Sequence, residues 1–159
     1  MRLLRSRYMI QSAQRTDPAP VVPAVLLSAI RGARPQLTLM ARAVVEAVLL
    51  TGGSIGSAHA VARLLGLPNR FKLARLLRRE GLPPLHRLAE WTTVLSWVRN
   101  AERTGASLCW MAFRSGRHPS ACYRLVKEVT GLTWEEVRSR GSRWLERRLM
   151  TEVRSLDPT

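Results

Sequence analysis

The chain has 159 residues, of which 46% are hydrophobic, and its formal net charge is +15. This length accommodates one compact domain or two small subdomains, and the apolar content is too high for a disordered chain. No apolar run approaches the roughly 18 residues that would span a bilayer, and no signal-peptide pattern follows the basic N-terminus. We therefore expect a cytoplasmic protein with no membrane partner.

The sequence shows no pattern typical of an enzyme or a metalloprotein. Cys109 and Cys122 are too few for a disulfide framework, and together with His118 they match no standard zinc spacing. There is no glycine-rich phosphate loop and no catalytic carboxylate pair, and His59 and His86 are expected at a helix surface and near a turn. These patterns predict no catalytic residue, no metal and no cofactor.

The positive charge is concentrated in particular segments. The chain has 26 Lys and Arg residues against 11 Asp and Glu residues. Residues 58–87 carry seven Arg or Lys residues and one glutamate, whereas the charges of residues 88–106 are balanced. Basic proteins attract polyanions, and each Lys or Arg near a phosphate adds affinity by releasing counterions. This distribution favours a nucleic-acid partner over a charge that only confers solubility.

The N-terminal third is predicted to hold an arm followed by two helices. Residues 1–20 read as a flexible basic arm that ends in a proline-rich linker. Residues 21–56 are predicted to form N-terminal helices that pack on residues 57–84. The second of these helices is expected from Leu37 to Leu50, with Thr51-Gly-Gly53 as its stop. The spacing predicts that it buries a stripe made of Leu39, Ala43, Val44, Ala47 and Leu50.

Residues 57–84 are predicted to form a first helix-turn-helix unit. Ser57 suits the N-cap of its first helix, and Gly66 supplies the backbone freedom for the turn. In its second helix, Leu73, Leu76 and Leu77 share the buried face. For Phe71 two interpretations stay open, a cap on the core and a contact with a thymine methyl group. The candidate DNA contacts of this unit are Arg70, Phe71, Lys72, Ala74, Arg75 and Arg78.

Residues 85–106 are predicted to form a linker whose helix runs from Leu85 to Thr104. Apolar residues recur at helical spacing, and the near-zero net charge suits a connector. Trp91 and Trp97 are expected to pack in the core rather than to stack on bases. About 20 residues span about 30 Å in a helix. This length is close to one turn of B-DNA, about 34 Å.

Residues 107–150 are predicted to form a second unit and a terminal helix. Ser107 and Gly116 repeat the N-cap and the turn, with a turn about one residue shorter than in the first unit. Thr133 and Glu136 read as a capping box that starts the terminal helix, and residues 151–159 read as a tail. The following side chains are expected to be buried in the second unit: Cys122, Leu125, Val126 and Val129. The candidate DNA contacts are Ser120, Ala121, Tyr123, Arg124 and Lys127.

The two units share a pattern that carries a family resemblance. Ala62-x3-Gly66 precedes Leu73-x-Arg75, and about 50 residues later Ala112-x3-Gly116 precedes Cys122-x-Arg124. With these residues the chain, over roughly residues 37–148, resembles the DNA-binding domain of AraC/XylS-type bacterial transcription regulators. The resemblance implies an all-α fold with two helix-turn-helix subdomains joined by a long linker helix. It also implies that the protein binds double-stranded DNA as a monomer.

The second unit departs further from the family than the first. Arg117, Cys122 and Trp134 stand where the family usually has an aromatic residue, a phenylalanine and a proline. Many members carry an effector-binding domain before the DNA-binding domain, and residues 1–36 are too short to form one, so we expect this chain to lack it. Three alternatives stay open: a single-domain regulator, a fragment of a longer one, and a diverged protein that recruits a partner.

The leading hypothesis is a sequence-specific transcription regulator in which Arg75 and Arg124 contact bases or phosphates. An ion pair within the domain is the alternative for both arginines. The other basic side chains of the candidate set, Arg70, Lys72, Arg78 and Lys127, are expected at phosphates. RNA polymerase stays open as a further partner. Other hypotheses are a nonspecific architectural or RNA-binding protein and a DNA-binding subunit of a transposase or phage regulator.

Overall fold

The computed structural model describes residues 24–154, which form nine helices and no strand. The expected all-α class is confirmed over this part of the chain. The predicted basic arm, residues 1–20, lies outside the described residues, as do residues 155–159 of the predicted tail. The helices are α1 (Ala24–Ala33), α2 (Leu39–Leu50), α3 (Ala58–Leu64), α4 (Arg70–Arg79), α5 (Leu85–Thr104), α6 (Leu108–Arg114), α7 (Pro119–Thr130), α8 (Trp134–Arg140) and α9 (Ser142–Arg154).

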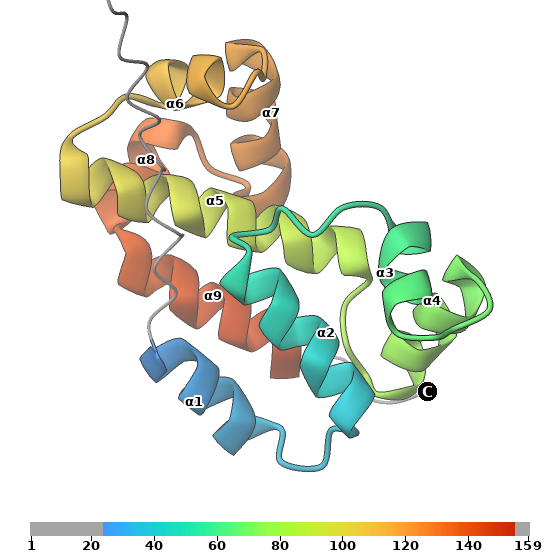
Figure 1. The fold of residues 1–159 in the computed structure, drawn as a ribbon. Coiled ribbons are helices and arrows are strands. Elements are labelled where there is room, and N and C mark those ends of the chain that lie inside the picture. The colour runs from blue at the N-terminus through green and yellow to red at the C-terminus, as the bar shows by residue number, and fades with distance from the viewer. Residues whose placement is uncertain (1–23, 155–159) are drawn as a thin grey trace, which may run out of the picture.

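Helix α5 is the centre of the fold and has the bounds that the sequence predicts. It is packed by α2, α7 and α9, and α3 and α4 lie near its start whereas α6 lies near its end (Figure 1). Trp91 is 1% exposed and Trp97 is 9% exposed, which confirms that both rings pack in the core. None of the helices formed by residues 24–154 is both long enough and apolar enough to cross a membrane.

Helix α2 buries a different face from the predicted one. Leu39 is 83% exposed, and Ala43 and Leu50 are also exposed, so the predicted stripe is wrong at these three positions. Val44 is buried as predicted, and Ala47 is half-buried. The helix is apolar around most of its circumference, and its spacing is therefore compatible with two faces. The tertiary contacts select the buried set Ala41, Val44, Val45, Val48 and Leu49.

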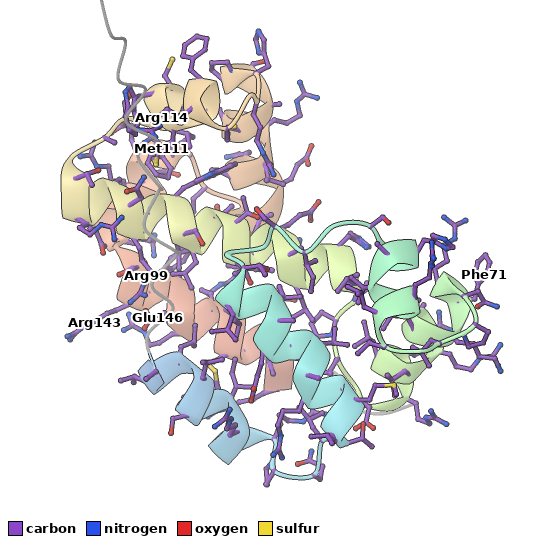
Figure 2. The ribbon with its side chains drawn as sticks, viewed as in Figure 1. Phe71, Arg99, Met111, Arg114, Arg143 and Glu146 are labelled. Atoms are coloured by element: carbon purple, nitrogen blue, oxygen red, sulfur yellow. The ribbon has the colours of Figure 1, made fainter. Side chains whose placement is uncertain are left out.

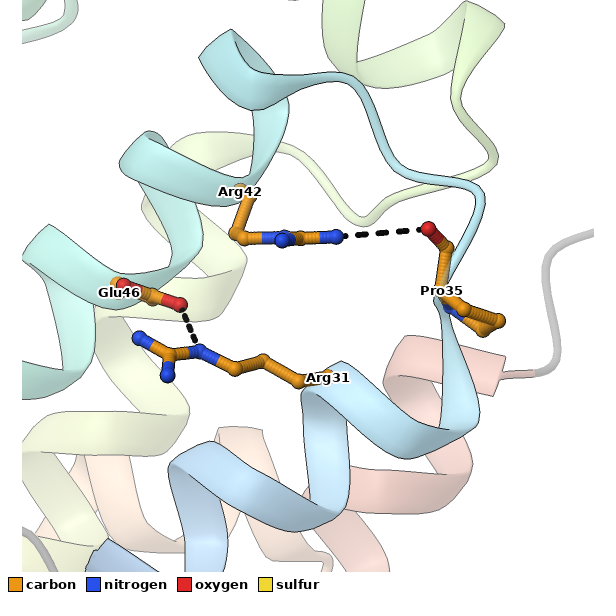
Figure 3. Close-up of polar contacts among 4 residues, drawn as sticks. All are labelled: Arg31, Pro35, Arg42 and Glu46. Carbon is orange, nitrogen blue, oxygen red and sulfur yellow. Dashed lines mark hydrogen bonds and ion pairs between the residues drawn. The ribbon is translucent and has the colours of Figure 1, made fainter.

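Polar contacts join α1 to α2 at the surface (Figure 3). Arg31 Nε donates to Glu46 Oε1 at 2.6 Å, and Arg42 donates to the carbonyl oxygen of Pro35 at 3.4 Å. The hydrogen bond from Arg31 holds the pKa of the Glu46 carboxyl below its usual range, and the charge of the guanidinium adds to this effect. These contacts fix the turn between the two helices.

A buried arginine connects three distant segments. Arg34, in the turn after α1, is 7% exposed, and its guanidinium donates to the carbonyl oxygens of Val153 at 2.6 Å, of Gly81 at 3.3 Å, and of Glu80. These carbonyls belong to the C-terminal end of α4 and the last turn of α9. A buried charge is tolerated only with such partners. Arg34 thus anchors the end of α4 to the body of the protein.

The single terminal helix that the sequence predicts after Thr133 is wrong. Two helices, α8 and α9, are separated by Gly141, whose φ is +85°. Glu102 of α5 accepts hydrogen bonds from both the amide and the hydroxyl of Ser142, each at 2.7 Å, and so starts α9 afresh. Helix α9 also continues to Arg154, past the predicted start of the tail. The capping box of Thr133 and Glu136 is confirmed at the start of α8.

Candidate nucleic-acid interface

The pairs α3–α4 and α6–α7 begin in the same way. Ser57 and Ser107 both have φ −76° and ψ 156°, and each hydroxyl accepts a hydrogen bond of 3.1 Å from the amide three residues on. Both serines are therefore the N-caps that the sequence predicts. Helices α3 and α6 are each seven residues long. Two segments 50 residues apart thus have the same local backbone conformation.

The two pairs also turn in the same way. Gly66 has φ +70° and Gly116 has φ +69°, values that favour glycine. The next amide donates to the carbonyl of Ala62 in the first pair and of Ala112 in the second, at 2.9 Å in both. This is the Schellman arrangement that closes a helix. The connection to the following helix then spans residues 65–69 in the first pair and 115–118 in the second, which confirms the shorter second turn.

Helix α4 is well defined at its start and on its buried face. The side chain of Asn69 accepts a hydrogen bond from the Lys72 amide at 3.0 Å, an N-cap that the sequence reasoning did not identify. Asparagine before a helix is itself a signal for such a cap. The expected burial of the three leucines is confirmed: Leu73, Leu76 and Leu77.

Phe71 lies on the outer surface of α4 and does not cap the core. Its side chain is 65% exposed and points away from the rest of the molecule (Figure 2). The guanidinium of Arg70 lies 5.0 Å from the centroid of its ring, within the range of a cation–π contact. Of the two interpretations of this residue, the core cap is therefore excluded.

The candidate residues of α4 are all exposed, but they divide between two sides of the helix. Arg70, Ala74 and Arg78, spaced four residues apart, line a cavity between α4 and the start of α5. Phe71, Lys72 and Arg75 are exposed and do not line that cavity. Among the candidates, the outward surface of α4 thus has one aromatic and two cationic side chains, and the exposed Arg79 lies one turn after Arg75 on the same side.

Helix α7 exposes its candidates and buries the expected face. His118 is its N-cap, and the imidazole Nδ1 lies 2.7 Å from the hydroxyl of Ser120, so this candidate also takes part in the cap. Tyr123 is 42% exposed, and the remaining candidates Ala121, Arg124 and Lys127 are exposed as well. The side chains of the opposite face are buried or half-buried: Cys122, Leu125, Val126 and Val129.

The cysteines of the second pair are free thiols. Cys122 is buried and Cys109 is half-buried. Burial raises the pKa of the Cys122 thiol, because the thiolate loses its hydration, and the nearby charge of Arg117 offsets this only in part. Within residues 24–154, no three His, Cys, Asp or Glu side chains lie where they could hold a metal ion together.

Helix α6 adds exposed aromatic residues that are not among the DNA contacts predicted from the sequence. Trp110 is 48% exposed and Phe113 is 70% exposed, and Arg114 lies 4.9 Å from the centre of the Trp110 ring. The buried face of α6 holds Met111 and Ala112. The helical period places Trp110 and Phe113 on the other side, so this pattern could have revealed them.

Neither Arg75 nor Arg124 takes part in an ion pair among residues 24–154. The ion pairs found there are Arg31–Glu46, Arg87–Glu152 and Arg99–Glu146. An intramolecular ion pair of Arg75 or Arg124 is therefore not observed in the described part of the chain. Both guanidinium groups are exposed on the outer surfaces of their helices.

Comparisons of the chain with protein-family models, with curated proteins and with solved structures found no match.

Proposed function

We propose that this protein is a cytoplasmic, sequence-specific regulator of transcription that binds double-stranded DNA as a monomer. In this proposal the pairs α3–α4 and α6–α7 are helix-turn-helix units, and α4 and α7 enter successive segments of the major groove. The observation that supports it is the repetition: two segments with the same caps and the same turn each present a basic, exposed second helix. No cofactor is required for this activity.

The length of α5 fits the proposed arrangement. Its 20 residues correspond to about 30 Å, close to the roughly 34 Å of one turn of B-DNA. The pair α3–α4 lies beside the start of this helix, whereas α6 lies over its C-terminal half and α7 packs against it (Figure 1). A rigid connector of that length would hold two reading helices on one face of a duplex.

The exposed side chains divide into readers and anchors. Arginine is the most common reader of guanine, because its two donors match the acceptors of that base. We assign this role to Arg75 and Arg124, with Phe71 against a thymine methyl group. Phosphate contacts fix the register of a protein on DNA. In this proposal the remaining basic side chains bind phosphates: Arg70, Lys72, Arg78 and Lys127.

Selection from random duplex DNA at physiological salt tests this proposal. A bipartite motif with half-sites about 10 bp apart is expected, because each unit reads one major-groove segment. The double variant Arg75→Ala/Arg124→Ala should lose the motif. Arg147→Ala, which removes one exposed charge from α9, should keep it. Selection that enriches no sequence would contradict the proposal.

The net charge of +15 favours a second candidate, a nonspecific nucleic-acid-binding protein. Such a protein binds through phosphates alone, and its affinity falls steeply with salt whatever the sequence. Equal affinity for the selected duplex, a scrambled duplex and a duplex RNA across a salt series would establish this candidate in place of the first. The proposed regulator should instead prefer the selected duplex at every salt concentration.

A further inference from the structure

An apolar cavity of about 630 Å³ separates α4 from the start of α5. Small-molecule sites in proteins are mostly apolar and have volumes of about 300–1,000 Å³. Most of the wall consists of aliphatic side chains from the α3 entry, α4 and α5. They include Leu73, Leu77, Leu85 and Ala89.

The charged side chains of the cavity wall are both arginines. Arg70 and Arg78 contribute guanidinium groups, and His86 contributes an imidazole. The lining residues, all within the described part of the chain, include no aspartate or glutamate. Arg70 and Arg78 are both exposed, but the guanidinium of Arg70 lies over the ring of Phe71, which does not line the cavity. Arg78 is therefore the cationic side chain that we expect to meet a molecule that enters. The cavity thus offers an apolar wall with a cationic group beside it.

This combination defines the chemical class of the occupant. An apolar wall gains free energy by covering apolar surface, whereas a carboxylate needs a charged hydrogen-bond donor when it leaves water. Guanidinium groups bind carboxylates through two parallel hydrogen bonds. A molecule with an aliphatic or aromatic body and one carboxylate meets both requirements. A neutral or cationic molecule meets only one of them.

We propose that the cavity is a binding site for a small amphipathic carboxylate, and that its occupant weakens DNA binding. The carboxylate pairs with Arg78, and the apolar body lies against Leu73, Leu77 and Leu85. The effect on DNA rests on the function proposed above, in which Arg78 holds a phosphate. A bound carboxylate neutralises Arg78 and so removes part of the attraction to the duplex.

Calorimetry with decanoate, below the concentration at which it forms micelles, tests the site in the absence of DNA. Decanoate should bind to the full chain, and decanol, which has the same body and no charge, should bind at least tenfold more weakly. Arg78→Gln should weaken decanoate binding about tenfold and leave decanol unaffected. Arg79→Gln, on the same helix and outside the cavity, is the matched control and should bind decanoate like the parent protein.

A second variant tests the cavity without altering charge. Ala89 is half-buried on the α5 wall, and Ala89→Phe places a ring in the space. This variant should lose decanoate binding while its circular dichroism and thermal midpoint show a folded chain. Arg78→Gln remains decisive if Ala89→Phe does not fold. The absence of decanoate binding to the parent protein, or equal binding of decanoate and decanol, overturns the proposed site.

Competition with the selected duplex tests the regulatory part separately. Decanoate should reduce the DNA affinity of the parent protein at least tenfold and leave that of Ala89→Phe unchanged. Decanoate that binds without any change in DNA affinity overturns the regulation and leaves the site. A chain that binds decanoate and no DNA refutes the proposed regulator, because the calorimetry does not depend on DNA.

Discussion

The two helix pairs share a local backbone but have different surroundings. Helix α7 packs against α5, α6 and α8, so the second pair is part of the core. Helix α4 packs mainly against α3, and a cavity lies between it and the start of α5. Its C-terminal end is held by Arg34. Identical caps and turns therefore determine a helix pair, but not how tightly the pair is attached to the protein.

The outward surfaces differ as well. The first pair presents Phe71, Lys72 and Arg75. In the second pair the hydroxyl of Ser120 lies within hydrogen-bond distance of His118, which leaves Tyr123 and Arg124 as the larger contacts. Two units with unlike surfaces would read two unlike half-sites. Two differences between the pairs can be tested: how tightly each pair is attached to the rest of the protein, and which bases each pair contacts.

The largest effect is expected from the glycines that precede the two pairs. Gly53 has φ +88°, and a Cβ there would overlap Thr93 Oγ1 and the carbonyl oxygen of Ala89 on α5. Gly53→Ala should lower the free energy of unfolding by about 2–4 kcal/mol, because overpacking adds to backbone strain. Gly105 has φ +72° and open space around it, so Gly105→Ala should cost only about 1 kcal/mol. Urea unfolding measures both values.

Equal losses at Gly53 and Gly105 would contradict this difference. They would mean that the entry to the first pair is no more tightly packed on α5 than the entry to the second.

Loss of the buried arginine should loosen the first pair more than the second. Arg34→Met leaves three carbonyl oxygens without their charged donor and should destabilise the protein by about 2–3 kcal/mol. Hydrogen exchange should accelerate in α4 more than in α7. Arg31→Met removes only an exposed ion pair and should cost at most about 1 kcal/mol. Uniform acceleration across both pairs would show that Arg34 stabilises the whole fold instead.

Single substitutions of Arg75 and Arg124 allow DNA recognition by the two pairs to be compared. Arg75→Ala should weaken binding to the selected duplex by about 1–3 kcal/mol and relax one position of the motif. Arg124→Ala should do the same in the other half-site. Affinities for a set of single-base variants of the duplex measure both effects. A uniform loss over all these duplexes would identify the arginine as a phosphate contact.

Removal of the N-caps should affect the two pairs equally. Ser57→Ala and Ser107→Ala each remove one hydrogen bond of 3.1 Å and should each cost about 1 kcal/mol. Chemical denaturation of the two variants gives the values. Costs that differ by more than about 1 kcal/mol would show that identical backbone angles do not imply equal capping energies.

The smallest effect concerns the capping box that follows the second pair and has no counterpart after the first. The hydrogen bond with the Thr133 amide lowers the pKa of the exposed Glu136 carboxyl below its ordinary value of 4.5. A depressed pKa stabilises the fold above that value, and the contribution is lost as the pH falls through the lower, folded-state pKa. Carboxyl titration by NMR gives this pKa. The pH dependence that Glu136 contributes should vanish in Glu136→Gln.

Local signals predicted much of this fold because the elements carry their own stops and caps. The bounds of α5 follow from Pro84 before it and Gly105 after it. The serine caps and the turns at Gly66 and Gly116 were likewise readable from residue type. The break at Gly141 was missed because the apolar spacing continues across it, from Trp134 to Leu149.

Features that depend on distant segments could not be predicted. The buried face of α2 is chosen by its neighbours, since its sequence allows two. Neither the partners of Arg34 nor the cavity beside α4 has a local signature. The helical period predicted which candidate side chains point outward. It could not predict that Arg70, Ala74 and Arg78 line a cavity while the other candidates of α4 do not, because this depends on where α5 begins.

The contact between Arg34 and Val153 has a consequence for synthesis on the ribosome. The two residues are separated by 119 positions, and the same guanidinium holds the end of α4. While the chain is being translated, α3 and α4 are complete long before α9 emerges. The bonds of Arg34 to Glu80 and Gly81 can therefore form as soon as α4 has emerged, whereas its bond to Val153 has to wait for the last helix.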